Sequence, residues 1–363
     1  MKIHNRLFLI GLIWLMALVP LQSAYAQNGE AHIRITQEDN SKFPQVTVYV
    51  SVTDASGEPL GANPNQIQIS ENGQVMKPEQ ISGSGDIGPL TTLLVMDVSG
   101  SMNNAGKLSA AKAAAQAYID QLRPGDKAGL ITFNTKVTYL QTITGDHAAL
   151  IQAIQSLKAK DDTAMFDALD QAIQILQDVS GRKAIIVLTD GLDNQSKHTA
   201  DEINQAIGAS GLSISTIGLG APGQGPYFGL DETALKSLAE KNGGIYSYAN
   251  NSDDLRSLFQ LYGRALQSEY RITYRSPLTL RDGVGRTLTI SLGSTASAQV
   301  KYNPGGVLPE VGNQASWTIF VFVLAALVIL IFAPGVFTHL LARKTAKVNL
   351  SAPDMQKPRI KLK

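Results

Sequence analysis

The middle of the chain alternates short apolar runs with segments of helical periodicity, and no other feature constrains the fold as strongly. The apolar runs cover residues 93–96, 128–133, 184–188, 214–217 and 245–248. Between the first two runs, Leu108, Ala111 and Ala115 recur at the spacing of a helix. Further helical patterns cover 150–157, 165–176, 235–238 and 255–259. Continuous apolar strands are typically buried on both faces, and strands that alternate with helices pair in parallel. Residues 90–267 therefore predict an α/β domain with a doubly wound, mainly parallel sheet.

The segments on either side of this domain have a different pattern of apolar and polar residues. Val46, Val48, Val50 and Val52 alternate with polar residues, which is typical of a strand with one buried face. Short alternating stretches return after residue 268. Neither segment offers enough strands for a stable sheet of its own. We expect residues 27–89 and 268–310 to form the two parts of one small β-sandwich, with the α/β domain inserted between them.

Both ends of the chain predict contact with a membrane. Residues 1–26 read as a signal peptide that ends in Ala24-Tyr25-Ala26, with an uncleaved anchor as the alternative. The run 311–342 contains no Asp, Glu, Lys or Arg, and we expect a transmembrane helix over 315–338 rather than a buried core helix. The tail, residues 339–363, is basic and is expected in the cytoplasm by the positive-inside rule. The expected location is therefore the cell membrane, as a single-pass protein with residues 27–310 outside.

Composition excludes several classes of protein. The chain has 363 residues and no cysteine, which rules out disulfides, thiolate metal sites and a thiol nucleophile. Its formal net charge is +1, whereas nucleic-acid binders usually carry a basic surplus, so we expect no nucleic-acid partner. That average hides seven basic residues against one acidic residue in 311–363. Because the chain has no cysteine, we expect any metal site to be built from oxygen ligands.

Polar side chains follow the predicted strands at one edge of the sheet. The first buried strand runs into Asp97, Ser99 and Ser101, and another strand runs into Asp190. Thr163 precedes the helix that begins near residue 165. Parallel strands bring their carboxyl ends to one edge, where ligands of such sheets bind. Carboxylate and hydroxyl oxygens are ligands for Mg²⁺, or for Mn²⁺ or Ca²⁺. Two carboxylates leave such an ion under-neutralised, so it would seek a further anionic oxygen.

These five residues resemble the metal-ion-dependent adhesion site of the von Willebrand factor type A domain. The family pattern is Asp-x-Ser-x-Ser, then a Thr, then an Asp, and Asp97, Ser99, Ser101, Thr163 and Asp190 match it in order. The resemblance implies that the serines contact the ion directly, the threonine directly or through water, and the aspartates largely through water. It also implies that a protein partner supplies an Asp or Glu to the open position.

The sequence departs from the family pattern just before Thr163, where Asp161 and Asp162 stand. These two acids could strengthen cation binding, act on the ion indirectly or repel an acidic ligand, and Asp162 could cap the following helix.

We expect a binding module and not an enzyme, since only Asp161, Asp162 or Asp193 could serve as a general base. The alternative function is a structural or assembly subunit of a membrane complex. The stretch ending in Gly106-Lys107 resembles a phosphate loop, but its spacing is wrong.

Overall fold

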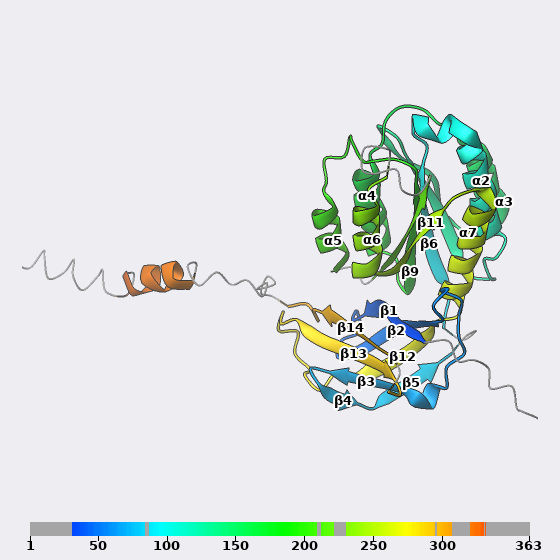
Figure 1. Cartoon of the computed structure of the whole chain (residues 1–363). Helices are drawn as coiled ribbons and strands as arrows, with labels where there is room; N and C mark the ends of the chain where they lie inside the picture. Colours follow the sequence, from blue (N-terminus) through cyan, green and yellow to red (C-terminus); the bar gives the residue numbers. More distant parts are fainter. Residues whose placement is uncertain are drawn as a thin grey trace, which may run out of the picture. The chain divides into compact units, whose positions relative to one another are not determined.

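A mixed sheet lies at the centre of the α/β part of the chain (Figure 1). The computed structural model describes residues 31–83, 87–208, 212–220, 230–294, 296–306, 320–329 and 331. The six strands lie in the order β11-β10-β9-β6-β7-β8. Their bounds are β6 Leu90–Asp97, β7 Lys127–Phe133, β8 Val137–Thr144, β9 Arg182–Thr189, β10 Ser213–Leu219 and β11 Gly243–Ala249. The five apolar runs all lie in parallel strands, which confirms the predicted α/β class.

In the α/β part, the sequence analysis missed one strand and one helix. β8 pairs antiparallel with β7 at the edge of the sheet, and its residues are only half-buried, so it lacks a continuous apolar run. Helix α5, Ala200–Gly208, was also not predicted. The other helices are α2 Lys107–Ile119, α3 His147–Gln155, α4 Met165–Gln177, α6 Glu232–Lys241 and α7 Ser252–Gln267, and short 3₁₀ helices cover η1 Pro64–Gln66 and η2 Gly100–Gly106.

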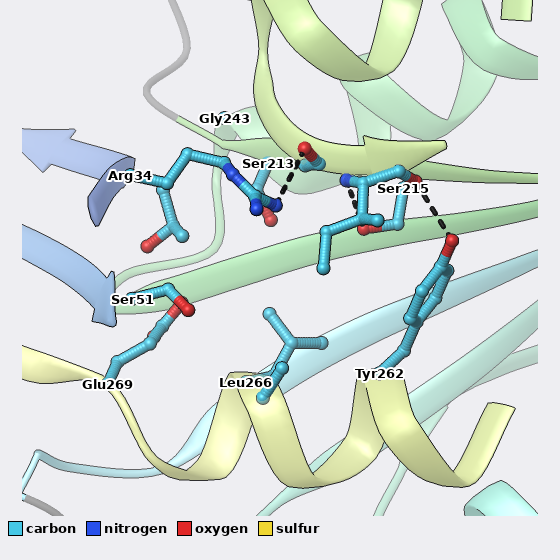
Figure 2. Close-up of a pocket in the computed structure, with 12 residues that line it drawn as sticks. Arg34, Ser51, Ser213, Ser215, Gly243, Tyr262, Leu266 and Glu269 are labelled. Carbon is cyan, nitrogen blue, oxygen red and sulfur yellow. Dashed lines mark hydrogen bonds between the residues drawn. The ribbon is translucent and has the colours of Figure 1, made fainter. Parts of the chain in front are cut away.

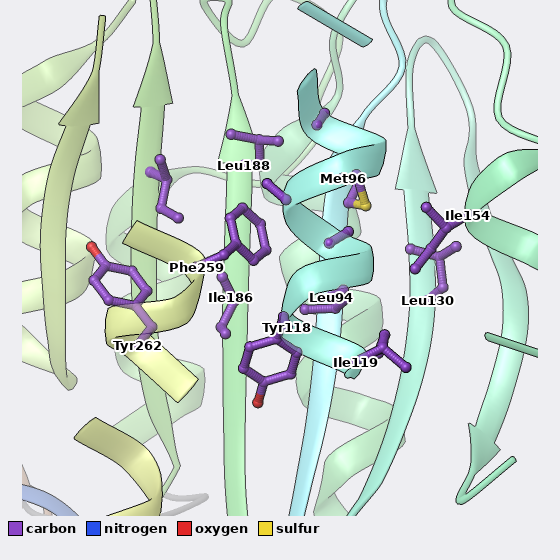
Figure 3. Packing of buried hydrophobic residues seen from close by; sticks show 14 of the residues in the cluster. Leu94, Met96, Tyr118, Ile119, Leu130, Ile154, Ile186, Leu188, Phe259 and Tyr262 are labelled. Atoms are coloured by element: carbon purple, nitrogen blue, oxygen red, sulfur yellow. The ribbon is translucent and has the colours of Figure 1, made fainter. Parts of the chain in front are cut away.

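Helices cover both faces of the sheet, with α2, α3 and α7 on one side and α4, α5 and α6 on the other (Figure 1). Successive residues of β6 point to opposite faces. Leu94 and Met96 enter the cluster beneath α2 and α7 (Figure 3). Leu93 and Val95 belong to the cluster on the opposite face, which includes residues of α4. Each such side chain, when fully buried, contributes roughly 1.5–3 kcal/mol. Burial on both faces fixes β6, and so fixes where its carboxyl end presents Asp97.

The two flanking segments combine through their strands. One sheet has the order β1-β2-β12-β5 and the other β14-β13-β3-β4, so strands from before and after the α/β part pair directly. The bounds are β1 His32–Asp39, β2 Gln45–Thr53, β3 Ile67–Glu71, β4 Gln74–Met76, β5 Pro78–Ser82, β12 Tyr270–Arg275, β13 Arg286–Leu292 and β14 Ala296–Tyr302. The valines of β2 are buried in the shared core. We refer to these two sheets as the sandwich.

The polar face of β2 is buried as well, which differs from the prediction of one buried face. Tyr49 and Ser51 are each only 6% exposed. The guanidinium of Arg182, at the start of β9, lies 5.6 Å from the centre of the Tyr49 ring. This face is covered because the sandwich packs against the amino end of the central sheet, a tertiary contact that alternation along one strand cannot reveal.

Polar contacts fix the junction between the sandwich and the α/β part. The Gln37 side chain donates to the Gly181 carbonyl and accepts from the Lys183 N–H, both at 2.8 Å. Arg182 forms a buried ion pair with Glu269. A cavity of about 20 Å³ remains beside Arg34 and Glu269 (Figure 2). It has room for about one water molecule, so it is a packing void and not a ligand site.

The predicted signal peptide and the basic tail lie outside the described residues. Of the predicted transmembrane segment 315–338, residues 320–329 and 331 are described; they are helical. Within the described part of the chain, no helix reaches the length and apolar character needed to cross a membrane. The chain divides into two compact units, residues 1–307 and 308–363.

Candidate metal site

Asp97 ends the buried strand β6 and organises the loop that follows. Its Oδ1 accepts the N–H of Ser99 at 2.7 Å, and its Oδ2 accepts the hydroxyl of Thr189 at 2.6 Å. Asp97 is fully buried, and this burial raises the pKa of its carboxyl group. A buried carboxylate without a cation is costly, so this position favours binding of a positive charge.

The two serines connect this carboxylate to Asp190. Ser99 Oγ lies 3.0 Å from Ser101 Oγ, and Ser101 donates to Asp190 Oδ1 at 2.6 Å. Asp190 follows the end of β9, next to β6 in the sheet. The sheet therefore places the two carboxylates as the sequence analysis expected, on neighbouring strand ends joined by the serine hydroxyls.

Thr163 reaches the same point from a third loop. A Cβ built on Gly191 would lie 3.3 Å from Thr163 Oγ1, 3.9 Å from Ser101 Oγ and 4.0 Å from Asp97 Oδ2. Three oxygens from two loops thus surround one point beside a third loop, and the missing side chain of Gly191 leaves room there. All five predicted residues come together, and their oxygens form the hard donor set that Mg²⁺, Mn²⁺ or Ca²⁺ accepts.

The loop that carries Thr163 is held by backbone and amide contacts. Asn194 Oδ1 accepts the Thr163 N–H, and the Asn194 N–H donates to the Thr163 carbonyl, both at 3.1 Å. Asp161 acts through its backbone, because its carbonyl accepts the Gly100 N–H at 2.8 Å. The proposed capping role of Asp162 is wrong: Asp193 Oδ2 accepts the Phe166 N–H at the start of α4 instead.

Lys107 is the residue that sequence reasoning missed. Its ammonium lies 2.7 Å from Asp190 Oδ2, and the Asp190 side chain is fully buried. The sequence analysis considered Lys107 only as part of a phosphate loop and discarded it. Nothing in the local pattern pairs residue 107 with residue 190, because only the crossing of η2 over the strand ends brings them together. The pair neutralises one of the two buried carboxylates.

A larger cavity opens beside the donor set. It has a volume of about 860 Å³, and Lys107, Asp190, Tyr248 and Asn251 are among the residues that line it. In the described part of the chain, no group of three or more His, Cys, Asp or Glu side chains is positioned to hold a metal. The candidate site is the hydroxyl-rich set at the strand ends, where oxygens of Asp97, Ser101 and Thr163 lie around one point. A divalent ion held there would supply a Lewis-acidic position for an anionic oxygen.

Residues 92–192 match the family model of the von Willebrand factor type A domain, a stretch that contains all five donor residues. Together with the mixed, mostly parallel sheet, this match shows that the α/β part has a von Willebrand factor type A-like fold, and it is called the type A domain below.

Among proteins of known sequence, the chain is similar to one described as "UPF0353 protein" from Mycolicibacterium paratuberculosis. The two are 29% identical over 202 residues, which cover 49% of this chain and 60% of the relative. The chain therefore spans about 60% of the length of this relative. Among solved structures, it resembles a von Willebrand factor type A protein from Catenulispora acidiphila, with 14% identity, a TM-score of 0.45 and coverage of 77% and 75% of the two chains. Another is proximal thread matrix protein 1 from the mussel byssus with a zinc-occupied site motif, with 19% identity, a TM-score of 0.45 and coverage of 54% and 50%.

Proposed function

We propose that the chain is a membrane-anchored module that binds a protein partner through a divalent metal ion. The convergence of Asp97, Ser101 and Thr163 oxygens on one point is the observation that carries this proposal. Type A domains generally mediate binding between proteins, and the family match covers this site. In the proposal, the ion is held by the five matching residues, Asp97, Ser99, Ser101, Thr163 and Asp190. The ion that the protein binds in its natural setting is Mg²⁺.

The charges at the site indicate the chemistry of the partner. Lys107 compensates Asp190, so the buried carboxylate of Asp97 is the charge that remains. A divalent ion would leave one positive charge in excess. An Asp or Glu side chain from the partner would neutralise it. Of the five donor residues, Asp190 lines the neighbouring cavity of about 860 Å³. The site is proposed to bind and not to catalyse.

The anchoring part of the proposal rests on the apolar run 311–342. Residues 320–329 are helical, and their large apolar side chains are exposed in the structure, from 45% at Val321 to 75% at Phe322. A bilayer would cover such side chains. With the basic tail in the cytoplasm, the sandwich and the type A domain would work outside it.

Binding to immobilised peptides tests the partner chemistry. The full-length chain in detergent is passed over peptides that display Asp or Glu, with matched Asn or Gln peptides as controls. We expect retention on the acidic peptides in Mg²⁺, release by EDTA and loss in Asp97→Ala. Equal retention of acidic and amide peptides, or retention that survives EDTA, would contradict the proposal.

A further inference from the structure

One loop of the sandwich exposes large apolar side chains. The loop, residues 277–285, connects β12 to β13 and is called the apolar loop below. Leu278 is 50% exposed, Leu280 75% and Val284 61%. Single exposed apolar residues are ordinary, but here three occur within seven residues of one loop.

Buried charge holds the apolar loop in shape. Arg286, 1% exposed, donates to the carbonyls of Leu278 at 2.8 Å and Leu280 at 2.9 Å. The carboxylate of Glu71, which is also 1% exposed, lies 3.5 Å from the Arg286 guanidinium. It accepts a hydrogen bond from the Ser276 hydroxyl as well. The two bonds from Arg286 to the loop carbonyls fix the loop backbone, while Arg286 Nε is buried without a partner among the described residues. The three apolar side chains are therefore presented by an ordered scaffold.

The apolar loop lies against the residues where the chain leaves the sandwich. Arg281 donates to the Pro304 carbonyl at 2.7 Å, and the Gly283 N–H donates to the Gly305 carbonyl at 3.2 Å. Asp282 also forms a β-bridge with Gly306. Only eight residues lie between Gly306 and position 315, where the predicted transmembrane segment begins. Such a stretch spans at most about 32 Å when fully extended.

We propose that the apolar loop inserts into the outer surface of the bilayer that holds the segment 315–338. Leu278, Leu280 and Val284 would enter the boundary between headgroups and acyl chains, where exposed apolar side chains are shielded from water. Arg281 lies within the loop and donates to the Ser41 carbonyl, which places the exposed Lys42 beside the loop, where it would meet anionic headgroups. The inference rests on the proposed membrane anchor, and it fixes the end of the sandwich that faces the membrane.

The lack of native cysteine allows a direct test. Leu280→Cys introduces a single thiol, which is labelled with a polarity-sensitive fluorophore. Leu140→Cys is the matched control, because Leu140 is also an exposed leucine, 40% exposed, but lies on β8 of the type A domain. Each full-length variant is reconstituted into phosphatidylcholine–phosphatidylglycerol vesicles, with and without nitroxide-labelled lipid.

We expect blue-shifted emission and quenching by lipid nitroxide at position 280, and neither at position 140. If the chain floats with the vesicles but both labels report water, the inference is overturned while the anchor stands. A label at 280 that is shielded from an aqueous quencher yet untouched by lipid nitroxide would mean that protein covers the loop, which also overturns it. Failure of the chain to float with vesicles would overturn the anchor itself.

Discussion

The ammonium of Lys107 lies 2.7 Å from the buried carboxylate of Asp190, one of the five residues that match the metal site. A cation in this place has two opposing effects. It competes for Asp190 with an incoming metal ion, and it adds positive charge beside the position that a partner carboxylate would occupy. Lys107 therefore sets a balance between metal affinity and partner affinity.

Replacing Lys107 by Met should tighten metal binding and weaken capture of acidic peptides. Removing one positive charge near the ion favours the cation by on the order of 1 kcal/mol, or about fivefold in the dissociation constant. Calorimetric titration with Mg²⁺ measures the first effect, and the peptide assay the second. The matched control is Lys112→Met on the same helix, where Lys112 contacts the Gln155 carbonyl. Weaker metal binding in Lys107→Met would contradict the competing role.

Asn194 should influence metal affinity although it lies outside the donor set. Asn194 bonds both the N–H and the carbonyl of Thr163. Residues that orient metal ligands typically contribute about 10–100-fold in metal affinity. Asn194→Ala is expected to weaken Mg²⁺ binding by about tenfold. The neighbouring Gln195→Ala serves as the control, since the Gln195 side chain contacts only the exposed Asp162 carboxylate at 3.3 Å. Equal Mg²⁺ affinities in the two variants would contradict a role for Asn194 in metal binding.

The ion pair of Arg182 with Glu269 should stabilise the junction between the sandwich and the type A domain. Both residues are at most 3% exposed, so Glu269→Gln leaves a buried guanidinium without its anion. The free energy of unfolding should fall by about 3–5 kcal/mol, as measured by denaturant titration. The control is Glu58→Gln, which breaks the exposed pair with Arg264 and should cost at most about 1 kcal/mol. Similar losses of unfolding free energy in Glu269→Gln and Glu58→Gln would show that burial does not determine how strongly an ion pair stabilises the protein.

Stability should fall as the pH rises through the titration of Glu38. Burial raises the pKa of Glu38 from 4.5 to about 7 in the folded protein. Between these values the folded chain keeps a proton that the unfolded chain has released, so the free energy of unfolding decreases with pH across this window. Glu38→Gln should be more stable than the native chain at pH 8, by up to about 3 kcal/mol, and nearly equal to it at pH 4.5.

The control for this pH dependence is Glu79→Gln, since Glu79 is exposed and bonds only to Gln45 at the surface. Thermal unfolding across the pH range provides the comparison. A stability profile that is the same in Glu38→Gln and the native chain would contradict the assignment.

The sequence was most informative where burial on both faces leaves a continuous apolar run. Strands such as β6 and β9 were predicted for this reason, and their carboxyl ends then located Asp97 and Asp190. β8 was missed because an edge strand buries only part of each face. α5 was also missed.

Contacts between distant segments were beyond the reach of sequence patterns. The pairing of Lys107 with Asp190 depends on the path of η2, and the burial of Tyr49 depends on how the sandwich meets the central sheet. Asp162 was a reasonable candidate for the cap of α4, but Asp193, 27 residues away from Phe166, takes that role through a loop crossing.

The most direct test of the account is a calorimetric titration of the full-length chain with Mg²⁺, compared with Asp97→Asn. Asparagine keeps the size of Asp97 and the oxygen that accepts the Ser99 N–H, but it removes the buried negative charge. The account predicts one divalent-ion site in the native chain and none detectable in the variant, with both chains equally folded in EDTA. Equal binding in the two chains, or no binding in either, would contradict the central claim that the strand ends form a metal site.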